Sequence, residues 1–440
     1  MEETVVAPAT PSGRGGVSIV RISGPEASLI GVSLCGELPQ PWSFKPCSIL
    51  SVGGGILDSG LVVFFAAPKS YTGEDVVEIH CHGNPLIVDS IVAEVVSLGA
   101  RIAEPGEFTK RAFLNDKIDL AQAESVADLI AAQTSSALVA ASSSLSGAFS
   151  ALVNKTIDGV VGVRVVVEAC LDFSDEESVS VFDEQKTLVR KGLVESLGVV
   201  GSLLDASRLG SKMREGLGVV LLGPPNCGKS TLLNALAKED VAIVSDVPGT
   251  TRDLLRVVLD LGGLPVEFVD TAGLHEDTEE VVEVEGMRRA VSAVDGADLV
   301  VLMSCVDEVF DPPINPAAKT LRVFNKIDVF PDAASSGSAG VYISALTGEN
   351  LGGFIEAVFA CFGVGPGIEV PVLARRRHLG FLEQALASLE SSLSALDGGE
   401  DLVLVAEDLK EAQNFLGFIT RPVTSDELLG NIFSEFCIGK

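Results

Sequence analysis

The stretch Gly223-Pro-Pro-Asn-Cys-Gly-Lys-Ser230 fits the pattern G-x-x-x-x-G-K-[ST] and decides the local fold. It follows the apolar run Leu217–Leu222, which reads as a buried strand, and a helical pattern opens from Ser230 to Lys238. Glycines at both ends let backbone N–H groups face a polyphosphate, Lys229 reaches the outer phosphates, and the Ser230 hydroxyl can ligate Mg²⁺. The sequence therefore predicts a phosphate-binding loop between a strand and a helix.

Three further motifs follow in the order of a guanine-nucleotide-binding domain. Asp270-Thr-Ala-Gly273 follows the apolar run 265–269, which places a carboxylate at a strand end near the metal. Asn325-Lys-Ile-Asp328 offers a carboxylate that can accept two hydrogen bonds from guanine, an arrangement that adenine lacks, and Ser344-Ala-Leu346 offers N–H groups to the guanine carbonyl. Each motif alone is also typical of a strand-ending turn. The four in this order predict a Ras-like P-loop GTPase domain.

The loop Ser245-Asp-Val-Pro-Gly-Thr-Thr-Arg-Asp253 is the candidate first switch, with Thr251 as second Mg²⁺ ligand beside Ser230. Leu274 follows Gly273 where Ras has Gln, so another group must orient the attacking water. The residues that we expect to contact GTP are Asn226, Cys227, Gly228, Lys229, Ser230, Thr231, Ser245, Asp246, Val247, Pro248, Gly249, Thr250, Thr251, Asp270, Thr271, Ala272, Gly273, Asn325, Lys326, Asp328, Ser344, Ala345 and Leu346.

Length and composition limit the number of domains and the classes of partner that this chain can have. A chain of 440 residues predicts two to four domains, and a formal charge of −30 counts against a broad basic surface for nucleic acid. Basic groups remain at Arg375-Arg-Arg377, which also reads as a solvated helix start, and at 208–214. No apolar run reaches about 18 residues, and the N-terminus lacks the pattern of a signal peptide. Eight cysteines without a C-x-x-C pair suit reduced thiols. We therefore expect a cytoplasmic protein without a membrane span.

The pattern along the chain predicts a multidomain α/β plus all-α protein. Short β-like runs at 4–7, 17–22, 61–65 and 76–81 alternate with Gly/Pro turns and indicate an N-terminal α/β domain. Helical spacing from 120 to 170 predicts two long helices, and it continues from 183 to 208. It resumes at Arg375, after the nucleotide-binding segment. A GTPase domain inserted into a helical domain fits this order.

The chain ends Phe436-Cys-Ile-Gly-Lys440, and with the inserted GTPase domain this resembles the tRNA-modification GTPases of the MnmE/TrmE family. Further segments agree over essentially the whole chain: 9–16, 70–75, 105–108, 111–117, 119–124, 249–253 and 373–379. The resemblance implies three parts. They are an N-terminal tetrahydrofolate-binding and dimerisation domain over 1–118, a helical domain over 119–215 plus 364–440, and a GTPase domain over 216–363.

What the resemblance implies about function is a GTP-hydrolysing component of a tRNA-modification complex. Members work as homodimers with the FAD-dependent partner MnmG (GidA) on tRNA. They add an aminomethyl or carboxymethylaminomethyl group to carbon five of the wobble uridine. A 5-formyl- or 5,10-methylene-tetrahydrofolate supplies the one-carbon unit, and glycine or ammonium supplies the nitrogen.

The family's folate contacts fall on Arg21, Glu78, Lys117 and the terminal Lys440. A carboxylate can pair with pterin N–H donors, and cations suit the glutamate tail. Without the resemblance, Arg21 and Lys117 read as surface ion-pair residues. The intervening His80-Cys-His82 could hint at a metal, but no third ligand is obvious, so both histidines read as structural.

The resemblance also implies K⁺ where other GTPases place an arginine finger, with Asn226 as side-chain ligand and Ser245, Val247 and Thr250 in the closing loop. Ser245 stands where the family often has Thr. Arg252 is the candidate if another cation completes the site.

Two further catalytic assignments come from the resemblance. Glu283 matches the family's water-orienting Glu, although Glu280 or Glu285 could serve, and a solvated helix start is the plain alternative. Cys437 is either a packing residue, a nucleophile that adds to the uridine ring, or a participant in one-carbon transfer.

Two other functions compete with the modification GTPase. A regulatory or ribosome-assembly GTPase would share the four nucleotide motifs but would be expected to carry a basic RNA module. A folate-dependent transferase would explain residues 1–118 but not the GTPase motifs. Binding of formyl-tetrahydrofolate to the N-terminal region discriminates between them.

Overall fold

The fold was obtained as a computed structural model, which describes residues 3–172, 179–239, 255–270, 294, 296–306, 310, 318–330, 340–362, 373–399, 401–421, 426–434, 436, 438 and 439. Contacts divide the chain into two compact units. Unit 1 combines Met1–Ala127, Leu145–Val165 and Leu409–Lys440, and unit 2 combines Asp128–Ser144 and Val166–Asp408. The domain boundaries expected at 118, 215 and 363 stay predictions.

Unit 1 contains a six-stranded sheet in the order β3-β4-β5-β2-β1-β6, antiparallel except for the parallel pair β1–β6. Its strands are β1 (Val5–Pro8), β2 (Gly15–Ser23), β3 (Phe44–Leu50), β4 (Ile56–Phe65), β5 (Val76–Gly83) and β6 (Arg101–Ile102). Alternate residues such as Ile22 and Ile79 enter an apolar core, while Arg21 and Glu78 lie on the opposite face. The four β-like runs predicted for this region are confirmed as strands.

Three helices accompany this sheet: α1 (Ala27–Cys35), α2 (Pro85–Ser97) and α3 (Glu107–Leu114). Apolar residues of α1 and α2, including Leu34 and Ile91, complete the core on one face. Asn84 caps α2 by accepting a hydrogen bond from the N–H of Leu86, and Pro85 follows at the first helical position. The sheet and these helices form the α/β fold that the sequence predicts for this segment.

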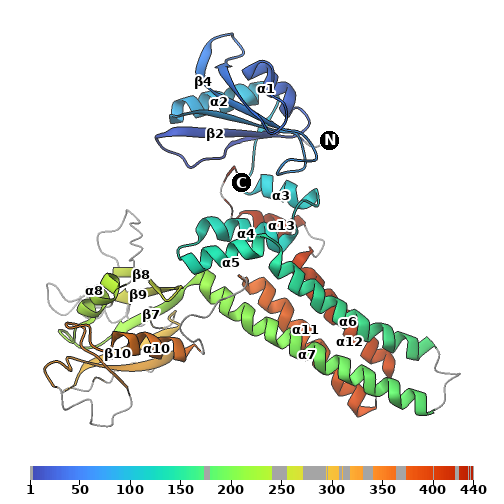
Figure 1. The fold of residues 1–440 in the computed structure, drawn as a ribbon, viewed down its shortest axis with the longest axis vertical. Coiled ribbons are helices and arrows are strands. Elements are labelled where there is room, and N and C mark those ends of the chain that lie inside the picture. Colours follow the sequence, from blue (N-terminus) through green and yellow to red (C-terminus); the bar gives the residue numbers. More distant parts are fainter. Residues whose placement is uncertain are drawn as a thin grey trace. The chain divides into compact units, whose positions relative to one another are not determined.

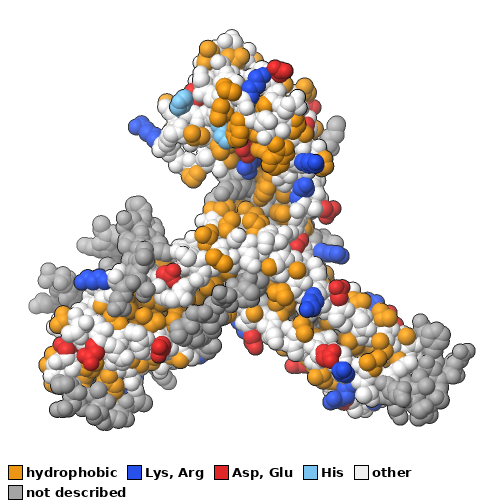
Figure 2. All heavy atoms as spheres, in the orientation of Figure 1, with side chains coloured by type: hydrophobic (Ala, Val, Ile, Leu, Met, Phe, Trp, Pro, Cys, Tyr) orange, Lys and Arg blue, Asp and Glu red, His pale blue; other side chains and the backbone are white. Residues whose placement is uncertain are grey.

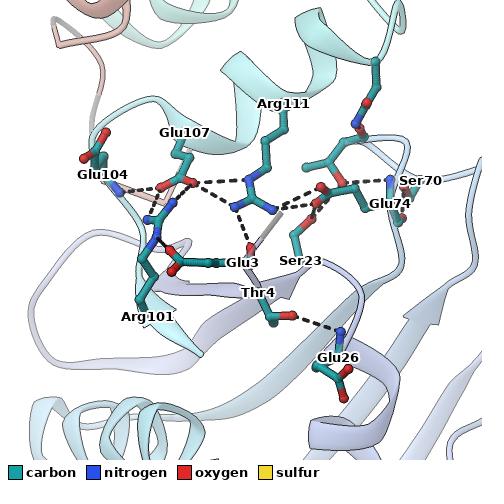
Figure 3. A network of polar contacts seen from close by, with 12 residues as sticks. Glu3, Thr4, Ser23, Glu26, Ser70, Glu74, Arg101, Glu104, Glu107 and Arg111 are labelled. Atoms are coloured by element: carbon teal, nitrogen blue, oxygen red, sulfur yellow. Dashed lines mark hydrogen bonds and ion pairs between the residues drawn. The ribbon is translucent and has the colours of Figure 1, made fainter. Parts of the chain in front are cut away.

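A buried ion-pair network joins α3 to the sheet (Figure 3). Arg111 pairs with Glu74 at 2.9 Å and with Glu107 at 2.9 Å, and it donates to the carbonyl of Glu3. Arg101 forms a forked pair with both oxygens of Glu107, at 2.7 and 2.6 Å. Burial by itself raises the pKa of Glu107, but hydrogen bonds from Arg101, from the backbone of Glu104 and from Arg111 lower it to about 2.

Helical segments complete unit 1. They are α4 (Leu120–Ala131) and α6 (Ala148–Asp172) in part, α12 (Leu402–Thr420) in part, and α13 (Asp426–Ser434). Arg164 of α6 donates to Gln413 of α12 at 2.6 Å. A side chain at Gly106, before α3, would lie 2.6 Å from the carbonyl of Phe433 in α13, so the C-terminal helix packs directly against the turn. Residues from both ends of the chain thus share one unit.

The expectation of two long helices between 120 and 170 was wrong, because three helices occupy this stretch. The third is α5 (Ser135–Leu145), which lies between α4 and α6. Thr134 accepts a hydrogen bond from the N–H of Ala137 at 3.1 Å and so caps a new helix start. Gly147, at φ 93°, ends α5 in a conformation that glycine favours.

Unit 2 contains a second six-stranded sheet, in the order β12-β11-β10-β7-β9-β8, with only β8 antiparallel. Its strands are β7 (Leu217–Leu222), β8 (Leu255–Leu261), β9 (Leu264–Asp270), β10 (Leu299–Cys305), β11 (Lys319–Asn325) and β12 (Val341–Tyr342). Helix α8 (Lys229–Glu239) contacts β8 and β9, and α10 (Leu351–Cys361) contacts β11 and β12. The strand before the predicted phosphate-binding loop and the helix after it are both confirmed.

The long helices α7 (Val179–Glu215) and α11 (Arg376–Gly398) lie side by side in unit 2 (Figure 1). Arg375, at the start of α11, is only 7% exposed and pairs with Asp128 at 2.8 Å. The prediction of a solvated helix start was therefore wrong for Arg375, because its guanidinium is buried and paired with a carboxylate. Arg376, with a side chain 85% exposed, does fit that description.

Within the described residues, no single helix is long and apolar enough to cross a membrane, although the bent pair Ser135–Leu145 and Ala148–Leu171 passes such a test by length and composition. On the face drawn in Figure 2, the described Lys and Arg side chains lie singly or in small groups, without a broad basic patch.

Candidate functional site

The loop between β7 and α8 has the backbone of a phosphate-binding turn. Asn226 and Gly228 have φ values of 64° and 101°. A side chain at Gly223 would lie 2.1 Å from the carbonyl oxygen of Met303, and one at Gly228 would lie 2.2 Å from Nδ2 of Asn325. Only glycine fits these two places, which is the requirement that the phosphate-binding pattern carries.

Lys229 begins α8 and is 6% exposed. Its ammonium donates to the carbonyls of Gly223 at 2.7 Å and Pro224 at 3.1 Å, so the charge is held within the loop. Ser230 and Asn226 are exposed on the same turn. A positive charge at a helix N-terminus beside an accessible hydroxyl suits a polyphosphate with Mg²⁺.

Asn325 brings three of the predicted motifs together. Its side-chain N–H₂ donates to the carbonyl of Cys227 in the phosphate-binding loop at 2.8 Å. Its side-chain oxygen accepts from the N–H of Ala345 at 2.9 Å. Asn325 is 3% exposed, so these bonds are shielded from water. The loop and the two guanine-reading motifs therefore form one site.

Asp328 lies at the surface of this site. Its Oδ1 accepts from the hydroxyl of Ser344 at 2.7 Å. An ionised carboxylate can accept several hydrogen bonds, so Asp328 keeps capacity for guanine. Lys326, with φ 71°, turns the chain between Asn325 and Asp328, and Leu346 is 78% exposed.

Asp270 ends β9 in register with Leu221 of β7, which places the start of the Asp-Thr-Ala-Gly motif beside the phosphate-binding loop. Thr231 is exposed in the first turn of α8. The other predicted contacts of this site lie outside the described residues: Ser245, Asp246, Val247, Pro248, Gly249, Thr250, Thr251, Arg252, Thr271, Ala272, Gly273, Leu274, Glu280, Glu283 and Glu285.

In unit 1, two of the predicted folate contacts meet on neighbouring strands. Arg21 of β2 lies opposite Glu78 of β5, and Nε and Nη2 of the guanidinium each lie 2.8 Å from one carboxylate oxygen. Arg21 also donates to the carbonyl of Gly439 at 3.4 Å. Its guanidinium lies over the rings of Tyr71 and Phe108, at 5.8 and 5.6 Å from their centres. No role was predicted for these two aromatic residues, although both lie in segments that carry the resemblance.

The remaining folate candidates are less fully placed. Lys117 donates to the carbonyl of Pro68 at 2.8 Å. Lys440 and Cys437 lie outside the described residues. The neighbouring Gly439 has φ 93°, and a side chain there would lie 1.9 Å from the carbonyl of Pro8, so the C-terminal segment packs closely on the end of β1.

The two nearby histidines each have a carboxylate neighbour. His82 contacts Asp58 at 2.8 Å, and His80 lies 3.4 Å from Glu78. Burial raises the pKa of Asp58, but hydrogen bonds from His82 and Ser59 outweigh it and lower the pKa. Among the described residues no group of three side chains could hold a metal ion. Burial raises the pKa of the intervening Cys81 thiol to about 11.

Together, the central strand, the glycine turn with its buried lysine, and the Asn325 bridge define a P-loop GTPase domain within a larger chain. Comparisons with known proteins agree. A family model described as the MnmE helical domain matches residues 120–437, and one described as the GTP-binding protein TrmE N-terminus matches 4–117. The chain belongs to the MnmE family of tRNA modification GTPases.

Curated relatives share nearly the full length. The tRNA modification GTPase MnmE of Alkalilimnicola ehrlichii is 44% identical over 99% of both chains. That of Nitrosomonas europaea is 42% identical over 100% of this chain and 99% of its own, and that of Haemophilus influenzae strain PittEE is 41% identical over 100% of both. A solved G domain of the T. maritima FeoB iron transporter covers 33% of this chain and 98% of its own at 22% identity, with a TM-score of 0.23, too slight a likeness to bear on function.

Proposed function

We propose that this GTPase is the GTP-hydrolysing component of a complex that modifies the wobble uridine of tRNA. The group added at carbon five is aminomethyl or carboxymethylaminomethyl. The one-carbon unit comes from 5-formyl- or 5,10-methylene-tetrahydrofolate, and the FAD-dependent MnmG works alongside a homodimer of this chain in the cytoplasm. Family membership supports this proposal, and the observation that carries the GTPase part is the Asn325 bridge between the phosphate-binding and guanine-reading motifs.

Hydrolysis breaks the bond between the β,γ-bridging oxygen and the γ-phosphorus as water attacks in line. Lys229 is placed to balance the negative charge of the outer phosphates, and the exposed hydroxyl of Ser230 would hold Mg²⁺, with Thr251 as second ligand. Mg²⁺ held there would supply charge neutralisation to the phosphates. Asp328 reads guanine while Ser344 fixes its carboxylate.

We further propose that K⁺ supplies the charge that an arginine finger gives elsewhere. Asn226 supports this, because it is an exposed residue of the phosphate-binding loop, where it has a positive φ. Ser245, Val247 and Thr250 would close over the ion, and Glu283 would orient the water.

For the folate, Arg21 and Glu78 offer a cation and a carboxylate on one sheet face. A pterin would pair with Glu78 through its N–H donors, and Lys117 and Lys440 would meet the glutamate tail. The ring of Tyr71 beside Arg21 is 38% exposed and adds apolar surface for a flat ligand, while the ring of Phe108 beneath the guanidinium is buried. Cys437 would act next to this site, as nucleophile or in one-carbon transfer.

The test is mass spectrometry of wobble uridines from cells that lack this chain, complemented with single variants. Wild type should restore the modified uridine, while Lys229→Ala and Arg21→Ala should not. Lys191→Ala and Arg190→Ala remove exposed ion-pair residues of α7 and serve as matched controls that should restore it. Normal wobble modification without this chain would leave a regulatory or ribosome-assembly GTPase as the remaining assignment.

A further inference from the structure

In unit 2, a buried carboxylate of α4 holds the chain where it enters and leaves the GTPase domain. Oδ1 of Asp128 lies 2.8 Å from Nε of Arg214, at the end of α7, and 2.8 Å from Nη2 of Arg375, before α11. Arg214 lies three residues before Leu217, the first residue of β7. The side chains of Asp128 and Arg375 are 7% and 9% exposed, so this cluster is a fixed anchor and not a screened surface pair.

A few residues further on, the corner between α4 and α5 contacts the turn between β8 and β9. The hydroxyl of Thr134, which caps α5, donates to the carbonyl of Gly263 at 3.1 Å. Gly263 has φ 96°, and a side chain there would lie 2.3 Å from Oγ of Ser136. Thr134 is 4% exposed. The turn between β8 and β9 therefore packs directly against the start of α5, without space for a side chain at Gly263.

Apolar packing continues this contact. Ala137 and Ala140 of α5 share one core cluster with Leu259, Leu261 and Leu264 of the hairpin. Packed interiors respond to a displacement by moving as blocks, because they leave few voids to absorb it. A movement of the hairpin along its length must therefore be followed by α5 or break the contact.

The hairpin also links the two nucleotide-sensing segments. β8 begins at Leu255, just after the candidate first switch, and β9 ends at Asp270, where the second switch motif begins. Switch segments are ordered by a γ-phosphate and released after hydrolysis. A change of order in either segment would therefore act on the same two strands, and the turn at their far end contacts Thr134.

We propose that the α4–α5 corner is the relay through which the nucleotide state reaches the helical segments of unit 2, and that Thr134 is its positioning residue. The inference rests on the proposed GTP binding and goes beyond it. Asp128 holds the entry and exit fixed, so the β8–β9 turn is the part that transmits movement. The ligand acts by binding the two arrangements of the hairpin unequally.

Hydrogen exchange of the full chain with Mg²⁺ and K⁺ tests the relay, in GDP and in guanosine β,γ-imidotriphosphate. In wild type, amides of Ser135–Leu145 should exchange at rates that differ by at least about fivefold between the two nucleotides. Thr134→Asp keeps an oxygen that caps α5 but cannot donate to the carbonyl of Gly263. In this variant the exchange rates of the α5 amides should differ by less than about fivefold between the two nucleotides. Thr134→Ser keeps the hydroxyl and should preserve it.

A second pair of variants approaches the contact from the hairpin. Gly263→Ala should also uncouple α5, because its methyl group meets Ser136. Gly399→Ala, at φ 74° with open space around it, carries similar backbone strain without the contact and should leave the coupling intact. GTP hydrolysis by Thr134→Asp should stay within about threefold of wild type, since Thr134 lies outside the nucleotide-binding motifs.

Three outcomes would decide against these ideas, each in its own way. If the switch segments respond to the nucleotide but α5 of the wild type does not, the relay is refuted. If Thr134→Asp and Gly263→Ala keep the full wild-type difference, the corner follows the hairpin by another route and the role of Thr134 is refuted. If neither nucleotide alters exchange anywhere, the switches included, the proposed function itself fails.

Discussion

Arg111 shows how one residue can hold a domain together. Its guanidinium contacts the carboxylates of Glu74 and Glu107 and the carbonyl of Glu3, so it ties α3, the loop before β5 and the start of β1. A planar fork with five donors suits three acceptors, whereas an ammonium would satisfy them less well. The sequence marks Arg111 only as part of a family segment. Its partners are distant in the chain, so neither periodicity nor spacing could reveal them.

Arg111→Ala should destabilise unit 1 by about 3 to 5 kcal/mol, because Glu74 would remain buried without its ion-pair partner and Glu107 would keep only Arg101. Urea unfolding followed by fluorescence of Trp42, the single tryptophan and a residue of unit 1, measures this loss. Lys45→Ala removes an exposed pair with Glu37 from the same sheet and should cost less than about 1 kcal/mol. Equal losses in the two variants would contradict the assigned role of the network.

Glu107 makes this stability depend on pH. Its pKa in the folded chain is about 2 against an ordinary value of 4.5, a difference worth roughly 3 kcal/mol. Since the folded pKa is the lower one, the stabilisation is complete above pH of about 4.5 and is lost as pH falls toward 2. Urea midpoints measured by Trp42 fluorescence should fall across this window. Glu107→Gln should have a lower urea midpoint than wild type at pH 6, and its midpoint should fall less steeply as the pH decreases. An unchanged dependence of the midpoint on pH would assign the titration to other groups.

At the scale of elements, the turn between β7 and α8 depends on glycine at two close approaches. Gly228 combines φ 101° with an approach to Asn325 that leaves no space for a methyl group. The pattern G-x-x-x-x-G-K-[ST] carries this requirement, which is why the sequence located the strand, loop and helix correctly.

Gly228→Ala should lower GTP affinity by at least about tenfold, because the methyl group displaces Asn325 and breaks its bond to Cys227. Equilibrium titration with a fluorescent GTP analogue measures the change. Gly99→Ala is the matched control, with φ 105° but nothing near the added methyl group. Comparable losses in both would mean that backbone strain alone, without the Asn325 contact, explains the effect.

Other elements escaped prediction for physical reasons. β3 was missed because Pro46 interrupts an already short pattern, and proline is tolerated there since β3 is an edge strand. The break between α4 and α5 was missed because Ala and Ser continue on both sides of Thr134, and its capping role is visible only from the hydrogen bond to Ala137. Likewise, Arg375 reads as a surface residue until Asp128, distant in sequence, is placed beside it.

At the scale of the whole molecule, the two candidate ligand sites belong to different units. Arg21 and Glu78 lie in unit 1, and the phosphate-binding loop lies in unit 2. The sequence predicted the chemistry of both sites from motifs and from the family resemblance. It could not show that Tyr71 and Phe108 flank Arg21, because this depends on how loops cross the sheet.

Lys229→Ala should therefore abolish GTP binding or turnover and leave binding of 5-formyl-tetrahydrofolate within about threefold of wild type, since substitutions at sites that share no partners act additively. Arg21→Ala should do the reverse. Calorimetric titration of each variant with each ligand measures both effects. Loss of both ligands in either variant would point to a folding defect or to coupling between the units, and the circular dichroism melt of the variant separates these cases.

The shared contact of Arg214 and Arg375 with one oxygen of Asp128 also has a consequence for modularity. Because both arginines reach the same atom, the places where the GTPase domain is inserted lie within two side-chain lengths of each other. A linker of about six residues, which spans roughly 20 Å when extended, could replace residues 216–374. The two insertion points are thus close enough for the helical segments to be joined directly. A foreign domain whose termini are adjacent could be inserted at the same place.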